Sequence, residues 1–346
     1  MARTGEKIAA ASGSLTSAVN GNIFCHVLLA IVISGVFGHL KNVEFWRRAF
    51  AIVAMIFWAA TAVATAASSV PGGYVREIEL ERAARVEQLT KPDGWLTLVG
   101  LHFLRAGENS VGAAANNTIV LAKGPAHLGT VTLSADGKAA ITVNPAADVL
   151  VDGRQVLSAP LDEGGEGRSV THVTSGTISF FVIDRGGRKA LRVKDSASER
   201  RTHFAGIDYF PVDPTWKIEA DWVPFDRPRE VPIKNILGQE EPALVPGKAV
   251  FKRDGRTFEL LPFIEGSDEP LFFVIADATS GKETYAAARF LDADPPHDGK
   301  LVLDFNLARN PPCAFTPFAT CPLPPNENRL PIAVTAGEKK YRREAD

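Results

Sequence analysis

The chain has 346 residues, of which 45% are hydrophobic and 23% are charged, and its formal net charge is −2. This composition is typical of a globular protein and argues against wholesale disorder. Because the net charge is close to zero, no global field attracts nucleic acid, and we expect no nucleic-acid partner.

Two apolar stretches lie within the first 67 residues. Residues 23–40 are nearly all apolar, cationic residues follow between 41 and 48, and a second apolar stretch over 49–67 contains the small residues Ala64-Thr65-Ala66. Charge, an apolar stretch and small residues in that order are the pattern of a secretory signal. The second stretch is also long enough to span a membrane as a helix. The sequence therefore predicts a signal or transmembrane region over 1–67.

Two arrangements fit this region. In one, the true start lies downstream of Met1, and a cleaved signal begins near Lys41 or Val43. In the other, both apolar stretches span the membrane as a hairpin, and the cationic loop 41–48 stays in the cytoplasm. Both arrangements export the chain after Ala67. We therefore expect a periplasmic protein, or one anchored to the membrane through an uncleaved N-terminal segment and facing outward.

One helix is predicted after this region, over residues 74–89. Its apolar residues recur at roughly helical spacing, with Glu and Arg on the other faces: Ile78, Ala83, Val86 and Leu89. The run Lys91-Pro92-Asp93-Gly94 ends the helix, because proline cannot continue it and glycine adopts left-handed backbone angles at little cost.

Strand signals dominate the rest of the chain. Short apolar or alternating runs separated by turn signals cover 95–104, 130–143, 148–157, 177–195, 249–263, 270–279, 283–291, 300–307 and 330–337. The hairpins among them turn at Asp136-Gly137, Asp152-Gly153, Gly186-Gly187 and Asp254-Gly255, and Asp-Gly suits a type I′ turn. This spacing predicts a mainly β fold, an antiparallel sandwich and/or a partly closed barrel, with one early helix.

A stretch rich in proline and glutamate, 226–247, separates two groups of predicted strands. It predicts a boundary between an N-terminal β lobe with the early helix, 68–235, and a C-terminal β lobe, 236–346. One continuous β domain with long loops is the alternative.

Three motifs carry a resemblance to a known family. They are FVIDRGGRKALRVKDSASERRTHFAGIDYFPVDPTWKIEA, DATSGKETYAAARFL and LDFNLARNPPCAFTPFATCPLPPNENRLPIAVTAGEKKY. Over roughly residues 75–342 the chain resembles domain-of-unknown-function family 1684, with Ala288 where the family pattern has glycine. The resemblance implies an exported or lipid-anchored bacterial protein rich in β structure, and it implies no reaction.

A second likeness lies earlier, at GENSVGAAANNTIVL, residues 107–121. This stretch resembles the opening of a forkhead-associated sandwich, in which an arginine often precedes the glycine and a serine-histidine pair follows. Here Asn109 or Ser110 stands where that arginine would be, and no such pair follows. The likeness implies a sandwich but not phosphopeptide binding.

The C-terminal lobe contains a loop rich in cysteine and proline. Seven residues separate Cys313 from Cys321. In an oxidising compartment this spacing predicts a disulfide worth about 2–3 kcal/mol, with Cys25 outside the folded domain. Free thiols, a metal site and a catalytic thiolate are the alternatives. The loop prolines exclude it from a sheet centre, so it either locks the end of the barrel or lines a site.

Polar residues gather at predicted strand ends near this loop. The candidate ligand-binding residues are Arg289, Asp304, Asn306, Asn310, Arg329, Tyr285, Asp277 and Glu338. Arg289 and Asp304 each interrupt an apolar strand, and a charge that faces a β core must be paired. The two either form a structural ion pair, or Arg289 receives the anionic group of a ligand.

A separate group of arginines, between 185 and 201, could hold a phosphate or a carboxylate, although solvated strand edges are the usual place for such charge. The sequence shows no nucleotide-binding glycine pattern, zinc-protease motif or calcium loop, and we expect no cofactor and no metal. It predicts an extracytoplasmic binding or structural protein that holds a small polar or anionic ligand. The alternative is a hydrolase that uses Asp277, Asp304 or Glu338 for acid–base chemistry.

Overall fold

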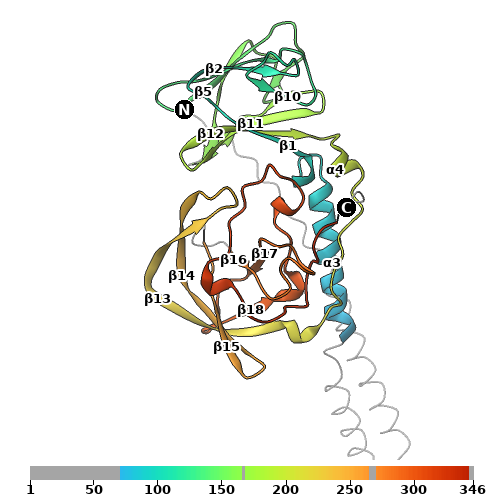
Figure 1. The fold of residues 1–346 in the computed structure, drawn as a ribbon, viewed down its shortest axis with the longest axis vertical. Helices are drawn as coiled ribbons and strands as arrows, with labels where there is room; N and C mark the ends of the chain where they lie inside the picture. Colours follow the sequence, from blue (N-terminus) through green and yellow to red (C-terminus); the bar gives the residue numbers. More distant parts are fainter. Residues whose placement is uncertain (1–70, 166–167, 265–269, 343–346) are drawn as a thin grey trace, which may run out of the picture. The chain divides into compact units, whose positions relative to one another are not determined.

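The computed structural model describes residues 71–165, 168–264 and 270–342 (Figure 1). The described residues all belong to one unit of the chain, Pro71–Asp346. The predicted signal or transmembrane region, 1–67, lies outside the described residues. Within the described ranges, no helix is long and apolar enough to cross a membrane.

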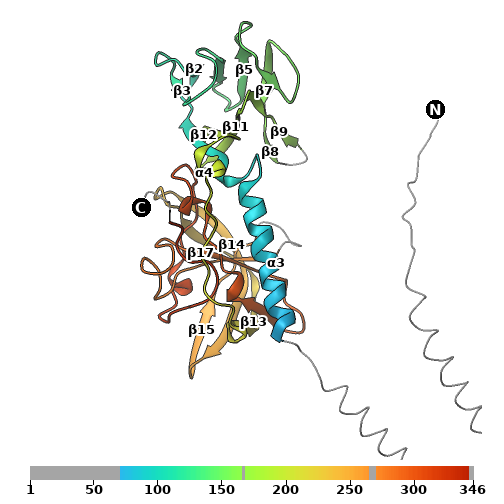
Figure 2. The same cartoon turned by 90° about the vertical axis from the view of Figure 1, so that its right-hand side faces the viewer.

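The predicted early helix is α3, Pro71–Thr90. In Figures 1 and 2 it runs beside the C-terminal strands, and it contacts the short helix η3, Phe305–Leu307. Near its C-terminal end, Leu89 packs with Leu96 and Phe315 in a small buried cluster. Tertiary packing against the C-terminal part of the chain therefore holds this helix.

After α3 the chain forms two five-stranded sheets. The order in the first sheet is β1 (Leu98–Phe103), β12 (Arg188–Asp195), β11 (Ile178–Arg185), β10 (Val173–Ser175) and β6 (Leu150–Val151). All pairings in this sheet are antiparallel.

The order in the second sheet is β3 (Ile119–Val120), β2 (Gly107–Gly112), β4 (Gly129–Leu133), β5 (Ala139–Val143) and β7 (Ser158–Leu161). Only the pairing of β2 with β3 is parallel among the described strand pairs. A small hairpin, β8 (Glu163–Gly165) with β9 (Arg168–Val170), and the short helix α4 (Glu199–Thr202) complete this region.

The two sheets share one core and so form a sandwich. Val131 and Ile141 of the second sheet lie in the same buried cluster as Phe180 and Leu191 of the first. Asn109 is fully buried, and its side chain bonds only to backbone groups. Asn109, one of the two residues that could stand in place of a phosphopeptide-binding arginine, therefore has a structural role.

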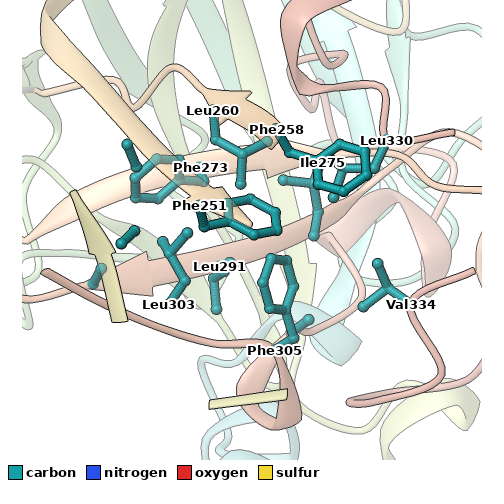
Figure 3. Packing of buried hydrophobic residues seen from close by; sticks show 14 of the residues in the cluster. Phe251, Phe258, Leu260, Phe273, Ile275, Leu291, Leu303, Phe305, Leu330 and Val334 are labelled. Atoms are coloured by element: carbon teal, nitrogen blue, oxygen red, sulfur yellow. The ribbon is translucent and has the colours of Figure 1, made fainter. Parts of the chain in front are cut away.

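The C-terminal part is a half-barrel around a second core. Its four-stranded sheet has the order β15 (Arg256–Leu260), β14 (Glu240–Arg253), β13 (Lys217–Lys234) and β18 (Lys300–Asp304), and a separate ladder pairs β16 (Leu271–Ile275) with β17 (Arg289–Ala293). Figure 3 shows the aromatic and aliphatic side chains that fill this core, among them Phe251, Phe273 and Phe305.

Prolines in β13 and β14 limit how far the four-stranded sheet extends along these strands. The register of β13 against β14 shifts between Pro224 and Arg229, and beyond the shift Pro232 lies opposite Pro242. Because proline has no N–H group, neither strand can sit in a sheet centre there. Beyond the shift, β13 and β14 form a strand ladder only with each other among the described strands, apart from an isolated bridge between Leu244 and Ile264. On the other side of the shift, β18 pairs with 217–221 of β13 and β15 with 249–253 of β14.

The mainly β prediction with one early helix is confirmed, but some elements differ. The predicted strand 330–337 is not a strand, and of 283–291 only the end belongs to β17. The turn at Asp136-Gly137 is not type I′, because only Gly137 has positive φ. The turns at Asp152-Gly153 and Asp254-Gly255 have positive φ at both residues, as type I′ requires.

The predicted division at residue 235 falls directly after β13, whose two partner strands lie beyond it. β13 is therefore part of the C-terminal sheet. How the chain divides into domains stays a prediction.

A buried ion pair crosses the C-terminal core. Arg289 donates from Nη2 to Asp277 Oδ2 at 2.8 Å, and both side chains are 1% exposed. Its guanidinium also donates to the carbonyl oxygens of Val334 and Ala336, while Asp277 Oδ1 accepts from the Val334 N–H at 3.2 Å. The pair thus holds the irregular segment 334–336, and the interpretation that Arg289 pairs with Asp304 is wrong.

We predict that Asp277→Ala lowers the free energy of unfolding by about 3–5 kcal/mol, because it leaves the Arg289 guanidinium buried without its carboxylate. Urea denaturation measures the change. Asp226→Ala, at an exposed position of β13, is the matched control and should change stability by less than about 0.5 kcal/mol. Equal small losses in both variants would contradict a buried pair.

The docking of α3 has a test within the helix itself. Leu89 is 0% exposed and Leu80 is 63% exposed. Leu89→Ala should cost about 2–5 kcal/mol of stability, the usual cost of a cavity in a core, whereas Leu80→Ala should be nearly neutral. If the two substitutions cost the same, α3 does not pack as described.

Candidate functional site

The inward face of α3 combines apolar residues with two arginines. The buried or half-buried residues of α3 are Tyr74, Val75, Ile78, Arg82, Arg85, Val86, Leu89 and Thr90. The spacing of most of them is that of one helical stripe, so Arg82 and Arg85 occupy positions where a core-facing helix usually has apolar side chains. Each of these two arginines reaches a different partner in the C-terminal part.

Arg85 pairs with a buried carboxylate. Its Nε donates to Glu338 Oε1 at 3.0 Å, and the Asn310 N–H donates to Glu338 Oε2 at 2.7 Å. Glu338 is 1% exposed. Burial raises the pKa of Glu338, while Arg85 and the Asn310 N–H oppose that shift. Because both carboxylate oxygens accept hydrogen bonds, Glu338 is a paired anion.

The backbone around Glu338 sets its position. Gly337 has φ +79°, and a Cβ atom there would collide with the Ala308 carbonyl oxygen. That same carbonyl accepts from the Glu338 N–H at 2.8 Å, and the Gly337 carbonyl accepts from the Phe210 N–H at 3.0 Å. A glycine is required before Glu338, because only glycine allows this φ and this close approach.

Arg82 has no carboxylate within ion-pair distance among the described residues. Its guanidinium carbon lies 4.3 Å from the centre of the Tyr209 ring, and Nη2 donates to the Phe210 carbonyl oxygen at 3.0 Å. Its Nε is buried without a hydrogen-bond partner, and so is the Tyr209 hydroxyl oxygen. Burial and the charge of Glu338 raise the pKa of Tyr209, so its hydroxyl stays protonated and can donate.

These side chains line a groove of about 390 Å³ between α3 and the C-terminal part, here called the α3 groove. Arg309, on its far side, pairs with Asp292 at 2.6 Å. The lining residues are Glu81, Arg82, Ala84, Arg85, Gln88, Tyr209, Asp292, Asn306, Leu307, Ala308, Arg309 and Glu338.

A second polar network lies at the start of α3. The Tyr74 hydroxyl donates to the Asp304 carboxylate at 2.8 Å and accepts from Asn306 Nδ2 at 2.9 Å. Burial and the hydrogen bond to Asp304 raise the pKa of Tyr74. Asn306 also donates to the Asp213 carbonyl oxygen. This network joins α3 to η3, and its groups bond to one another.

The remaining candidate residues lie apart from the α3 groove. Tyr285 donates to the Cys313 carbonyl oxygen at 3.2 Å. Arg329 is exposed and lines a different groove of about 350 Å³ beside β13 and the proline-rich stretch 323–327. Of the candidate ligand-binding residues, only Asn306 and Glu338 line the α3 groove. Asn310 does not line it, but its backbone N–H donates to the Glu338 carboxylate.

Sequence reasoning missed Arg82, Arg85, Tyr209 and Arg309, which supply most of the polar groups of the α3 groove. A signal was present for two of them. Arg82 and Arg85 follow Ile78 at helical spacing, so an arginine pair lay on the predicted buried stripe. Tyr209 and Arg309 lie in irregular segments, and no periodic pattern marks them.

The two cysteines of the loop are neighbours, and the structure holds both as free thiols. The Cys313 N–H donates to Cys321 Sγ at 3.2 Å. The predicted disulfide stays a prediction. In the described part of the chain, no group of three or more His, Cys, Asp or Glu residues is arranged to hold a metal ion.

Residues 202–339 match a family described as "Protein of unknown function (DUF1684)". No curated protein matches the chain. The solution NMR structure of the uncharacterized protein from gene locus rrnAC0354 of Haloarcula marismortui is 34% identical, with 40% of this chain and 78% of that chain covered and a TM-score of 0.35. The crystal structure of Rad53 1–466 in complex with AMP-PNP is 11% identical, with 63% of this chain and 50% of that chain covered and a TM-score of 0.17.

The matched range contains the second sequence motif, all but the last two residues of the third, and most of the C-terminal half-barrel, and the predicted family resemblance is confirmed there. It also contains Tyr209, Arg309 and Glu338 of the α3 groove, whereas Arg82 and Arg85 lie before it. Through residues 202–339 the chain belongs to the DUF1684 family.

Proposed function

We propose that this protein binds a small anionic molecule in the α3 groove. The observation that carries the proposal is the pair Arg82 and Tyr209. A guanidinium without a carboxylate partner lies against a tyrosine whose buried hydroxyl has no hydrogen-bond partner. Buried polar groups are nearly always satisfied in folded proteins, so a ligand oxygen that accepts from both groups explains why they are left open.

The arginines of the α3 groove are not all paired. Arg85 and Arg309 make ion pairs with Glu338 and Asp292. Arg82 makes no ion pair with a described residue, and Glu79 and Glu338 act on its charge only from a longer distance, so an anionic ligand group would add the partner that Arg82 lacks. Burial lowers the pKa of Arg82, and a partly desolvated guanidinium gains more from a charged acceptor than a solvated one does. A carboxylate or phosphate group matches the planar fork of arginine.

The size of the α3 groove is also suitable. Its volume of about 390 Å³ lies within the range of roughly 300–1,000 Å³ that is usual for small-molecule sites. Two mixed walls, one from α3 and one from residues 306–309, would orient a ligand that carries an anionic group and a short apolar or polar body.

A hydrolase, the other function that the sequence predicts, has less support. A general acid or base needs a carboxyl group free to exchange a proton with the substrate. Asp277 is held by Arg289, Asp304 by Tyr74 and Asn306, and Glu338 by Arg85 and Asn310. Because each carboxylate already accepts hydrogen bonds from the protein, binding is the favoured function.

We also propose that the protein works outside the cytoplasm. The support is the order of charge, apolar stretch and small residues in 41–67. The predicted disulfide between Cys313 and Cys321 belongs to the same proposal, since an oxidising compartment would form it.

Arg82→Gln should weaken anion binding by roughly tenfold to a hundredfold, because a hydrogen bond to a charged group contributes about 1.5–3 kcal/mol. Isothermal titration of the full chain with inorganic phosphate and with acetate measures the affinity, and glycerol serves as an uncharged probe of similar size. Tyr209→Phe, which keeps the ring and removes only the hydroxyl, should weaken binding by a smaller factor.

Arg76→Gln is the matched control, because Arg76 is an exposed arginine of the same helix. Its affinity for both anions should equal that of the unchanged protein. If neither anion binds, or if Arg82→Gln and Arg76→Gln bind alike, the α3 groove is not an anion site.

Export is tested separately, by fractionating a Gram-negative host that expresses the full chain. We expect the protein in the periplasmic or membrane fraction, and deletion of residues 41–67 should leave it in the cytoplasm. Cytoplasmic accumulation of the full chain would contradict the proposal.

A further inference from the structure

The irregular loop that contains Cys313 and Cys321 places a partly exposed thiol beside a buried one. Cys321 is 5% exposed, and Cys313 is more accessible. The Cys313 N–H donates to Cys321 Sγ at 3.2 Å, and the two thiols shift each other's pKa. The two sulfurs thus differ in access while they remain within reach of each other.

Contacts that involve no sulfur hold this loop in place. The Cys313 carbonyl accepts from the Tyr285 hydroxyl at 3.2 Å, and the Cys321 carbonyl accepts from the Ile236 N–H at 3.0 Å. The Thr316 hydroxyl donates to the Leu98 carbonyl at 3.0 Å. These contacts do not depend on whether the two sulfurs are bonded, so they can hold the loop in both the dithiol and the disulfide form.

A buried cation without an ion-pair partner lies over Trp95, which packs against the same hydrophobic cluster as the two cysteines. Arg192 of β12 is 8% exposed, and among the described residues its side chain makes no ion pair and no hydrogen bond. Its guanidinium carbon lies 5.3 Å from the centre of the Trp95 ring. Burial, followed by the nearby charge of Arg185, lowers the pKa of Arg192 to about 10.

An unpaired buried charge is costly, so a nearby anion would stabilise Arg192. A thiolate at Cys321 is such an anion. The hydrogen bond with Cys313 and burial raise the pKa of Cys321, and Arg192 opposes that shift. Arg192 is thus placed to stabilise negative charge on the buried sulfur.

We propose that Cys313 and Cys321 form a thiol–disulfide exchange centre that reduces small aliphatic disulfides and is itself left as a disulfide. This goes beyond ligand binding in the α3 groove, and it uses different residues. It also differs from a permanent staple, because both the dithiol and the disulfide would be working forms.

The exchange has two steps. The Cys313 thiolate attacks one sulfur of the disulfide R–S–S–R, the S–S bond breaks, and R–S⁻ leaves and takes up the proton that Cys313 lost. Cys321 then loses its proton and attacks the Cys313 sulfur, which releases the second R–S⁻, and that thiolate takes up the Cys321 proton. In total the protein loses two hydrogen atoms, and R–S–S–R is reduced to two molecules of R–SH.

The structure assigns the two sulfurs different parts. Cys313 is the attacking thiol, because it is the more accessible one. The hydrogen bond from Cys321 lowers its pKa, against the effect of burial, and the thiolate is the reactive form. Cys321 is the resolving thiol, because it is buried beside Cys313, and Arg192 stabilises it as its proton leaves.

The test uses the reduced full chain and oxidised glutathione. Mass spectrometry without added reductant should show loss of two hydrogen atoms from the protein, and excess reduced glutathione should restore both thiols without unfolding. A disulfide that excess glutathione fails to reduce in the folded protein would be a permanent staple and would overturn the proposal.

Single variants separate the two steps. Cys321→Ser should stop at a mixed disulfide between Cys313 and glutathione, formed at least tenfold faster than any adduct of Cys313→Ser. Equal rates for the two variants would overturn the assignment of the sulfurs.

Arg192→Gln should slow release of the second glutathione at least threefold near neutral pH, with less effect as the pH rises. In the Cys321→Ser background it should leave the first step unchanged, which shows that the protein is still folded. Arg188→Gln, an exposed position of the same strand, is the control. If Arg192→Gln and Arg188→Gln release glutathione at the same rate, Arg192 has no part in the exchange.

Discussion

The buried ion pair between Arg289 and Asp277 is the interaction on which the C-terminal part depends. Its guanidinium and carboxylate hold the backbone of 334–336, a segment that has no strand ladder of its own. The next residues, Gly337 and Glu338, are thereby placed against the Ala308 carbonyl, and Glu338 meets Arg85 of α3. One buried pair thus determines where the helix docks and where the α3 groove forms.

In this irregular region, buried side chains make the hydrogen bonds to backbone groups that a neighbouring strand would make in a sheet. Asn328 is fully buried, donates from Nδ2 to the Leu261 and Val274 carbonyls, and accepts from the Leu261 N–H. It therefore bridges backbone groups on either side as a strand would. Because each of these bonds requires one particular side chain, the region is held rigidly, and both proposed sites use that rigidity. The α3 groove lies where this irregular region contacts α3, and the cysteine pair lies where the same region contacts the sandwich.

Much of the fold is predictable from local patterns. Alternation with Asp-Gly or Gly-Gly turns identified β4, β5, β11, β12, β15 and the last part of β14, and helical spacing identified α3. The long strand β13 and the first part of β14 were not predicted, because 226–247 was interpreted as a break between lobes. The other failures have a common cause. An apolar run such as 330–337 carries the composition of a strand, yet its backbone groups bond to side chains and to carbonyls distant in sequence. The periodicity of apolar residues indicates which side chains are buried. It does not indicate which group accepts the hydrogen bond of a buried backbone N–H.

The sequence by itself determined the mainly β class, the early helix, the family and a set of polar residues that had to be paired. The tertiary structure alone decided the partners. Arg289 pairs with Asp277 and not with Asp304, and Glu338 pairs with Arg85. Arg82 pairs with no carboxylate of the described residues and instead donates to a backbone carbonyl. The reason is physical: burial makes pairing obligatory, but the distance between two side chains separated by 253 positions, as in Arg85 and Glu338, is set by packing of the whole core. Local composition contains no measure of that distance.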